Sequence, residues 1–367
     1  MVPVSVLAAW VLASTAVPAA ATTSYATNAI QAADFLLSIQ GSYGQISDYP
    51  GGGMVNYDSH MEYAMWGLAV AYQKTGDQKY LDGMKAGLTW LAARQRSDGS
   101  WWVGYAYLSP FDPIDSAYGV SATIGLFMHD LWWYDFLSGD HAFTTSLLPK
   151  VRSGLSFLYT KMRASDGTFR SAYVKNSNGV YVRNNYRYSS DQVDMYLGLR
   201  AASKLLGVQS YWDDAMKLRT ILAGSTFYLS TYKRYALGIT ATGVRDTYLS
   251  LLTVWPQGYI PWVIGNFTNT RASTAWLDAR ERHPEGSVVF RQGAHRYALA
   301  SEVLIGGHIG TGTANGTNSM QAKSWVAVRQ DDGTGGVTVS PVNLDQYSNL
   351  TAFAMLCWYN MHPRLPA

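Results

Sequence analysis

Five acidic residues stand where they could take part in acid–base chemistry. Asp58 and Glu62 lie four residues apart before an uncharged stretch, Asp191 and Asp194 lie three apart at the start of another apolar stretch, and Asp115 precedes a third. Hydrolysis of a glycosidic bond needs two carboxyl groups with separated pKa values, one protonated to assist the leaving group and one ionised to activate water. These five residues are therefore the candidate catalytic acids and bases.

Aromatic and basic side chains are concentrated in the same segments. Sugar rings present flat C–H faces that stack on aromatic rings, and their hydroxyls need charged or amide partners. A cleft that combines tryptophan, tyrosine and scattered charges meets both needs. The sequence predicts these substrate-binding residues: Trp101, Trp102, Tyr105, Tyr107, Tyr186, Arg187 and Arg245.

Local patterns also offer these acids structural roles. The four-residue pattern of a helix capping box occurs at 59–62 (Ser-x-x-Glu) and at 189–192 (Ser-x-x-Gln). Asp115 could be an N-cap, and Asp191 suits the positive field of a helix N-terminus. The catalytic interpretation therefore depends on the five acids converging at one end of successive helices.

Asp194 differs because it lies a turn inside an otherwise apolar helix, where capping no longer accounts for it. An ionised carboxylate that is buried without a partner is costly. Asp194 therefore needs a basic partner, for which Arg187 and Arg245 are the candidates, or a chemical role.

An internal repeat predicts the architecture that positions these residues. A helix end followed by a glycine turn recurs about every 58 residues, and six copies account for most of the chain. A fainter copy lies near Gly238. The clear copies centre on Gly44, Gly99, Gly167, Gly286 and Gly333.

Each repeat contains two kinds of helix. Residues 78–95 form an amphipathic helix, which is typical of an outer layer. Uncharged or apolar helices, which indicate packing on all sides, are expected at 63–73, 116–128, 193–206, 246–255, 294–305 and 349–358. Many end at a glycine signal: Gly76, Gly139, Gly207, Gly258 and Gly306. Six inner helices ringed by six outer ones predict an all-α (α/α)6 barrel.

Two stretches carry a resemblance to known proteins. Residues 85–101, with the phrase Gln-Arg-Ser-Asp-Gly-Ser-Trp, resemble the QW-type repeat of α/α-toroid proteins, which include terpene cyclases, six-hairpin glycosidases and toroidal pectate lyases. Residues 58–135 resemble the two-hairpin pattern of toroidal carbohydrate-active enzymes. The resemblance implies the toroid fold and is compatible with carbohydrate chemistry.

Composition excludes several other classes of protein. The chain has 28 basic and 25 acidic residues, a net charge of +3, and no basic block of the kind that nucleic-acid binding needs. Its 48% hydrophobic content excludes intrinsic disorder. One cysteine excludes an intrachain disulfide and a cysteine-based zinc site, and no histidine pair has metal-ligand spacing on a helix, so no metal is expected.

The N-terminus predicts export. Residues 1–21 have an apolar core and a small-residue cleavage site, which are typical of a signal peptide, and an uncleaved anchor is the alternative. No other run is long enough to span a membrane. We expect a secreted protein whose residues 22–367 form a single toroid domain, without stable membrane insertion after cleavage.

The leading hypothesis is an exported inverting glycoside hydrolase that acts on a polysaccharide or oligosaccharide without a cofactor. Glu62 or Asp58 would be the acid, and Asp115, Asp191 or Asp194 the base. A polysaccharide lyase of the same fold is the runner-up, with calcium bound near a uronate and with Arg183, Arg187, Arg245 and Tyr186 as its key residues. A non-catalytic glycan-binding surface protein is a third possibility.

Overall fold

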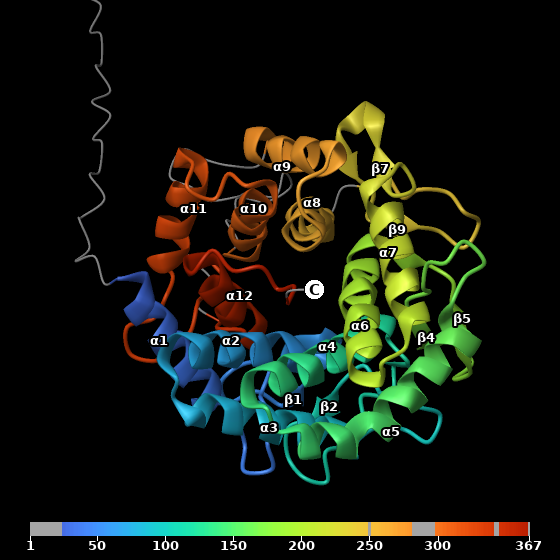
Figure 1. Cartoon of the computed structure of the whole chain (residues 1–367), viewed down its shortest axis with the longest axis horizontal. Helices are drawn as coiled ribbons and strands as arrows, with labels where there is room; N and C mark the ends of the chain where they lie inside the picture. Colours follow the sequence, from blue (N-terminus) through green and yellow to red (C-terminus); the bar gives the residue numbers. More distant parts are fainter. Residues whose placement is uncertain (1–23, 249–250, 281–297, 341–344, 366–367) are drawn as a thin grey trace, which may run out of the picture.

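The computed structural model describes residues 24–248, 251–280, 298–340 and 345–365, and within them twelve α-helices form two concentric rings (Figure 1). The inner ring consists of α2 (His60–Thr75), α4 (Ser121–Ser138), α6 (Ser189–Leu206), α8 (Leu251–Ile264), α10 (Ala298–Thr311) and α12 (Ser348–Trp358). The outer ring consists of α1 (Tyr25–Ser38), α3 (Gln78–Ala93), α5 (His141–Phe157), α7 (Gln209–Ala223), α9 (Thr268–Arg280) and α11 (Thr317–Ala327).

The inner ring is closed. Each inner helix packs against the next along the chain, and α12 packs back against α2. Each outer helix contacts the two inner helices on either side of it. The (α/α)6 barrel is therefore confirmed. The predicted signal peptide, residues 1–21, lies outside the described residues, and no helix among the described residues is long and apolar enough to span a membrane.

Glycine marks the ends of only some inner helices. The stops at Gly76, Gly139 and Gly207 are confirmed, each with a left-handed backbone. The predicted stops at Gly258 and Gly306 are wrong, because both residues lie inside helices, α8 and α10. A Cβ at Gly258 would lie 1.8 Å from the carbonyl oxygen of Val303, so this glycine permits close helix packing.

The repeated glycine turns fasten neighbouring outer helices together. The Gln95 Nε2 donates to the carbonyl oxygens of Gly99 (3.0 Å) and of Lys150 (2.9 Å), which lies in α5. Gln40 donates in the same way to the carbonyl oxygens of Gly44 and Gly83. Gln330 donates to those of Gly335 and Asn28. The last turn therefore centres on Gly335 (φ +83°), not on the predicted Gly333, and Gly286 lies outside the described residues.

Gly99→Ala tests this fastening against a matched control. Gly99 and Gly139 both have positive φ, so an alanine costs about 1–2 kcal/mol at either site. A Cβ on Gly99 would also lie 2.2 Å from the Ser153 carbonyl oxygen, whereas a Cβ on Gly139 meets nothing within 4 Å. We expect Gly99→Ala to lower the free energy of unfolding by about 1–3 kcal/mol more than Gly139→Ala, measured by urea denaturation. Equal losses would contradict a role for the close approach.

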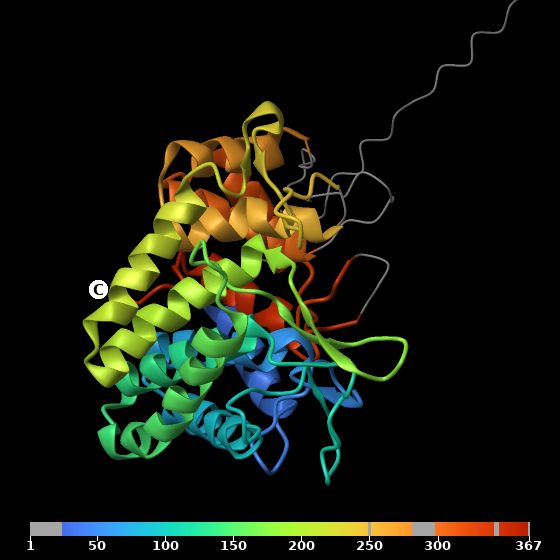
Figure 2. The ribbon, with the colours of Figure 1, turned by 90° about the vertical axis from the view of Figure 1, so that its right-hand side faces the viewer.

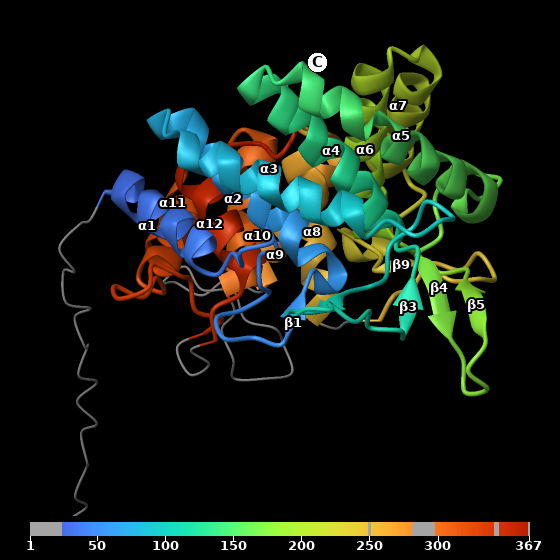
Figure 3. The same cartoon turned by 90° about the horizontal axis from the view of Figure 1, so that it is seen from below.

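Short antiparallel strands gather at one end of the barrel. They form a pair β1 (Met54–Val55) and β2 (Tyr105–Ala106), a three-stranded sheet β3 (Ala117–Tyr118), β4 (Ala172–Lys175) and β5 (Tyr181–Asn184), and the pairs β6 (Arg187–Tyr188) with β9 (Gly238–Ile239) and β7 (Tyr228–Leu229) with β8 (Arg234–Tyr235). The β4–β5 hairpin projects from this end (Figure 2), and the C-terminus lies at the opposite end (Figure 3). Because β1, β3 and β6 lead into α2, α4 and α6, the inner helices begin at the strand-bearing end, hereafter the mouth.

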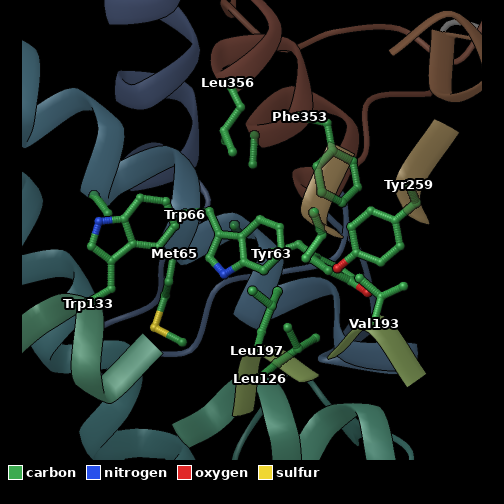
Figure 4. Packing of buried hydrophobic residues seen from close by; sticks show 14 of the residues in the cluster. Tyr63, Met65, Trp66, Leu126, Trp133, Val193, Leu197, Tyr259, Phe353 and Leu356 are labelled. Atoms are coloured by element: carbon green, nitrogen blue, oxygen red, sulfur yellow. The ribbon is translucent and has the colours of Figure 1, made fainter. Parts of the chain in front are cut away.

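The interior of the ring is packed with large side chains (Figure 4). Trp66 of α2 has no solvent exposure and lies edge-on to Tyr63 and to Phe353 of α12. Four tryptophans within helices belong to the core: Trp66, Trp90, Trp132 and Trp133. The inner helices therefore leave accessible side chains mainly at their ends.

Candidate active site

Asp58 is placed at the mouth by an unusual turn. The backbones of Asn56, Asp58 and Ser59 are all left-handed, and the 3-10 turn Tyr57–Ser59 leads directly into α2. The Asn56 Oδ1 accepts a hydrogen bond from the Met61 amide (3.0 Å), and its Nδ2 donates to Glu62 Oε1 (3.2 Å). This turn leaves Asp58 exposed while Glu62 is fully buried.

Asp191 and Asp194 approach the same place from α6. They lie three residues apart, so they occupy one face of the helix. Asp191 is half-buried, and Asp194 is 1% exposed. The Tyr259 hydroxyl of α8 donates to Asp194 Oδ1 (2.5 Å), and the Tyr63 hydroxyl of α2 donates to Oδ2 (3.2 Å). Figure 4 shows Tyr63 and Tyr259 reaching toward each other across the ring.

The electrostatics show that these three acids act on one another. Burial, opposed by the hydrogen bonds from Tyr259 and Tyr63 and reinforced by the charge of Asp58, raises the pKa of Asp194 to about 7. Burial and the charges of Asp194 and Asp58 raise the pKa of Asp191 well above its usual value. Asp58 is solvent-accessible but crowded by protein, and this partial loss of water raises its pKa too. We call Asp58, Asp191 and Asp194 the carboxyl cluster.

Two further acids lie in a buried layer beside the cluster. Burial raises the pKa of Glu62 to about 8, despite the hydrogen bond from Asn56. Asp48 is 1% exposed and accepts a hydrogen bond from the Tyr57 amide (3.1 Å), and burial raises its pKa to about 7. Glu62 was predicted from the sequence, whereas Asp48 was not singled out as a catalytic candidate. Neither presents its carboxyl group to solvent.

Asp115 is placed apart from the cluster. It precedes β3, its side chain is 63% exposed, and it forms an ion pair with Lys175 of β4. It does not cap α4, whose N-cap is Val120. The structure thus brings Asp58, Asp191 and Asp194 together, keeps Glu62 below them, and leaves Asp115 on the outer surface of the sheet.

The two predicted capping boxes are wrong. Ser59 makes no cap hydrogen bond, and its hydroxyl pairs with Thr123 Oγ1 instead (2.7 Å). Gln192 bonds the backbone nitrogen and oxygen of Phe169 (2.7 and 2.9 Å), and α6 has no side-chain cap at Tyr188. Ser59 therefore ties the start of α2 to the neighbouring inner helix α4, and Gln192 ties α6 to the turn at Phe169 and also donates to the Tyr188 carbonyl oxygen (3.0 Å).

The predicted basic partner of Asp194 is also wrong. Arg187 pairs with Asp166 (2.7 Å), and Arg245 donates to the carbonyl oxygens of Ser225 and Tyr228 (3.2 and 2.8 Å). Both arginines line a polar pocket of about 680 Å³. Among the contacts described above, only the hydrogen bonds from the Tyr63 and Tyr259 hydroxyls stabilise the Asp194 carboxylate.

The predicted aromatic residues divide into buried and accessible groups. Trp101 and Tyr105 are 1% and 3% exposed, and the Trp101 Nε1 donates to the Leu91 carbonyl oxygen (2.8 Å), so both belong to the wall of the barrel. Trp102 and Tyr107 are half-buried. Tyr186 is half-buried as well, and its hydroxyl donates to Asp246 Oδ2 (2.8 Å).

Trp102 belongs to an aromatic cluster that sequence reasoning missed. Tyr118 of β3 stacks on Tyr173 of β4, with ring centroids 5.1 Å apart, and Trp102 and Tyr181 of β5 contact the edge of this stack. We call Trp102, Tyr118, Tyr173 and Tyr181 the aromatic platform; all four are half-buried. The Asp58 amide donates to the Val103 carbonyl oxygen (3.1 Å), which joins the platform to the carboxyl cluster.

In the described ranges, no group of three or more His, Cys, Asp or Glu side chains is arranged to hold a metal ion. The lyase candidates Arg183, Arg187 and Arg245 are spread over β5, β6 and the segment after β9. Arg183 donates to Asn185 and to the Lys161 carbonyl oxygen (3.1 and 3.0 Å).

Comparisons with solved structures place the fold. The chain is similar to a D-mannose isomerase (TM-score 0.71, 11% identity, covering 91% of this chain and 96% of that one). It is also similar to a cellobiose 2-epimerase from Bacillus thermoamylovorans (TM-score 0.66, 10%, 88% and 95%) and to an unsaturated glucuronyl hydrolase specific for heparin (TM-score 0.66, 12%, 93% and 99%). The resemblance to α/α-toroid enzymes is confirmed at the level of fold. No family model and no curated protein sequence matches the chain.

Proposed function

We propose that this chain is a carbohydrate-active enzyme, and more specifically an inverting glycoside hydrolase. The observation that carries the proposal is the carboxyl cluster at the mouth, in which Asp191 and Asp194 resist ionisation while Asp58 faces solvent. Structural neighbours with this fold include a glycosidase, a glucuronyl hydrolase, an epimerase and an isomerase of sugars, which supports carbohydrate chemistry in general.

The roles follow from burial and charge. Two carboxyl groups on one helix face repel each other when both ionise, so the Asp191–Asp194 pair retains a proton near neutral pH. This pair is the general acid: Asp191 is its accessible member, and it gives the proton to the glycosidic oxygen as that bond breaks. Asp58 is the general base, which removes a proton from the water that attacks the anomeric carbon. This proposal exchanges the roles expected from the sequence, where Asp58 or Glu62 was the acid, because Asp191 and Asp194 are the more deeply buried of the three clustered acids.

The aromatic platform supports a polymeric or oligomeric substrate. Tyr118 and Tyr173 stack on each other, and the Arg96 guanidinium lies over the rings of Trp102 and Tyr118 (4.2 and 4.1 Å to the centroids). Sugar units beside the cluster would therefore contact the remaining faces and edges of these half-buried rings. Export through the N-terminal segment remains part of the proposal, because a polysaccharide substrate would be met outside the cell. Calcium enters only the lyase alternative.

The direct test is proton NMR of the purified protein with a panel of polysaccharides and oligosaccharides. We expect new reducing ends whose first-formed anomer has the opposite configuration to the cleaved bond. The matched control is the Asp194→Asn protein. Retention of configuration would contradict the inverting mechanism. Interconversion of reducing sugars without cleavage would show that the protein is an epimerase or isomerase and not a hydrolase.

Two further outcomes would overturn the proposal in other ways. An unsaturated product with ultraviolet absorbance, lost on addition of a chelator, would identify a calcium-dependent lyase. Glycan binding on an array without turnover of any bound glycan would identify a non-catalytic binding protein. In either case the carboxyl cluster would not be performing hydrolysis.

Tyr259→Phe should shift the pH dependence of activity. The pKa of Asp194 is about 7, so the protonated acid is lost, and activity falls, as the pH rises through about 7. The Tyr259 hydroxyl stabilises the ionised form, so its removal raises this pKa further and moves the fall to higher pH. The measurement is kcat against pH. Tyr232→Phe, at an exposed tyrosine, is the control and should leave the profile unchanged.

A further inference from the structure

A second cavity lies at the opposite end of the barrel from the mouth. Its volume is about 410 Å³. The C-terminal segment crosses this end of the ring (Figure 1). The Trp262 Nε1 donates to the Met361 carbonyl oxygen (2.8 Å), and the His129 Nε2 donates to the carbonyl oxygen of Pro363 (2.9 Å). We call this cavity the C-terminal pocket, and it is lined by Tyr196, Arg200, Trp212, Met216, Arg219, His362, Arg364 and Leu365.

The lining of the pocket carries three guanidinium groups and no acid. Arg219 donates Nε and Nη2 to the Ile264 carbonyl oxygen (3.2 and 2.9 Å), at the end of α8. Arg200 donates Nη2 to the Leu365 carbonyl oxygen (2.8 Å). Carbonyl oxygens carry only partial charge. The positive charges of Arg200, Arg219 and Arg364 therefore lie around one cavity, and the described lining residues include no full negative charge.

Arg200 places a buried positive charge in the wall of the pocket. It is 2% exposed, and its Nε and Nη1 have no hydrogen-bond partner within the described part of the chain. The rings of Trp132, Tyr196 and Trp212 lie 5.4–5.6 Å from its guanidinium carbon and offset part of the cost of burial. A buried charge with incompletely paired donors is nevertheless costly, and an anion in the neighbouring cavity would offset part of that cost.

The neighbouring charges strengthen this conclusion. Burial, opposed by Tyr196 and reinforced by the nearby charges of Arg364 and Arg219, lowers the pKa of Arg200 to about 10. Three like charges repel one another, and this repulsion would be relieved by a multiply charged anion held between them.

We propose that the C-terminal pocket binds a tetrahedral dianion, phosphate or a small phosphate monoester. Arg364 approaches the dianion from the C-terminal segment, and the charges of Arg200 and Arg219 attract it from the wall of the pocket. The cavity exceeds the size of a bare phosphate ion, and Trp212 and Met216 provide an apolar wall for the group that the phosphate carries. This site is separate from the carboxyl cluster and does not depend on the proposed hydrolase activity.

Calorimetric titration of the whole protein with inorganic phosphate tests the proposal. Arg364→Gln removes one charge without breaking a hydrogen bond described here, and we expect it to weaken phosphate binding by about 10- to 100-fold. The control is Arg152→Gln, at an exposed arginine of α5, which makes the same charge change and should bind as the unmodified protein does. Sulfate, which shares the shape and charge, should compete with phosphate.

Thermal unfolding provides a second readout that needs no glycan substrate. We expect phosphate to raise the midpoint of the unmodified protein more than sodium chloride does at equal ionic strength, and Arg364→Gln to remove most of that difference. Equal effects of phosphate and chloride on the unmodified protein would overturn the proposal. So would equal losses of affinity in Arg364→Gln and Arg152→Gln, because binding would then reflect overall charge.

Discussion

Asp194→Asn is expected to lower kcat by about 10²- to 10⁴-fold on whichever glycan the enzyme cleaves. The amide keeps the shape of the protonated carboxyl group and can remain between the Tyr63 and Tyr259 hydroxyls. It removes the negative charge that raises the pKa of Asp191, and it removes one of the two groups that share the proton. The structure should persist while the acid function is lost.

The measurement is steady-state kinetics, with circular dichroism and the unfolding midpoint as evidence that the variant is folded. Asp115→Asn is the matched comparison, since it changes an exposed acid that is paired with Lys175 on the sheet. We expect Asp115→Asn to retain nearly all activity. A folded Asp194→Asn protein with undiminished kcat would remove Asp194 from the mechanism.

The second large effect is expected from Asp58→Asn, which should also lower kcat by about 10²- to 10⁴-fold. Asp58 has φ +53°, and asparagine tolerates the left-handed region nearly as well as aspartate does. The turn that leads into α2 should therefore be preserved while the base is lost. In the unmodified enzyme, activity falls at low pH as Asp58 takes up a proton, and this acidic limb should disappear from the residual activity of the variant.

Asp58→Ala separates the two contributions of this residue. Alanine lacks the base and also adds about 1–2 kcal/mol of backbone strain in the left-handed conformation. We therefore expect equal losses of kcat in the two variants but a lower unfolding midpoint for Asp58→Ala alone. If Asp58→Asn retained a normal acidic limb, the base would have to be another residue.

The fold was accessible to sequence reasoning because the inner helices have unusual compositions. A helix such as α4, with buried residues on every face over Ser121–Tyr134, has no lysine or arginine and only one acid, Asp130, in that stretch. Six such stretches alternate with amphipathic ones. Helix boundaries were less accessible. Gly258 and Gly306 have the type expected at a helix end, but tertiary packing uses their small size inside the helix.

Only part of the carboxyl cluster could be predicted. Asp191 and Asp194 share a helix face, so helical periodicity alone places them together. The separation of Asp58 from Glu62 depends on the left-handed backbone at Asn56, Asp58 and Ser59, which no residue type there dictates. Asp115 was expected to lie beside the other four acids, but the loop before α4 folds outward into β3 and carries Asp115 away from them.

The tyrosine partners of Asp194 could not be predicted from the sequence for a related reason. Tyr259 lies 65 residues from Asp194 along the chain, in an apolar helix where it looks like ordinary core. The available signal was chemical: a phenol hydroxyl that is buried needs a hydrogen-bond partner, and Asp194 was a buried acid in need of one. Matching such unsatisfied groups between apolar helices could have found the pair.

The bond between Gln330 and the Asn28 carbonyl oxygen joins residues 302 positions apart, at the seam where α12 and α1 meet. During synthesis, the first helices therefore emerge long before the partners that cover them. The nascent chain must carry an uncovered apolar flank until its final hairpin leaves the ribosome, which makes this a slow, late-closing topology. Chains shortened at the C-terminus should consequently aggregate rather than accumulate as smaller folded rings.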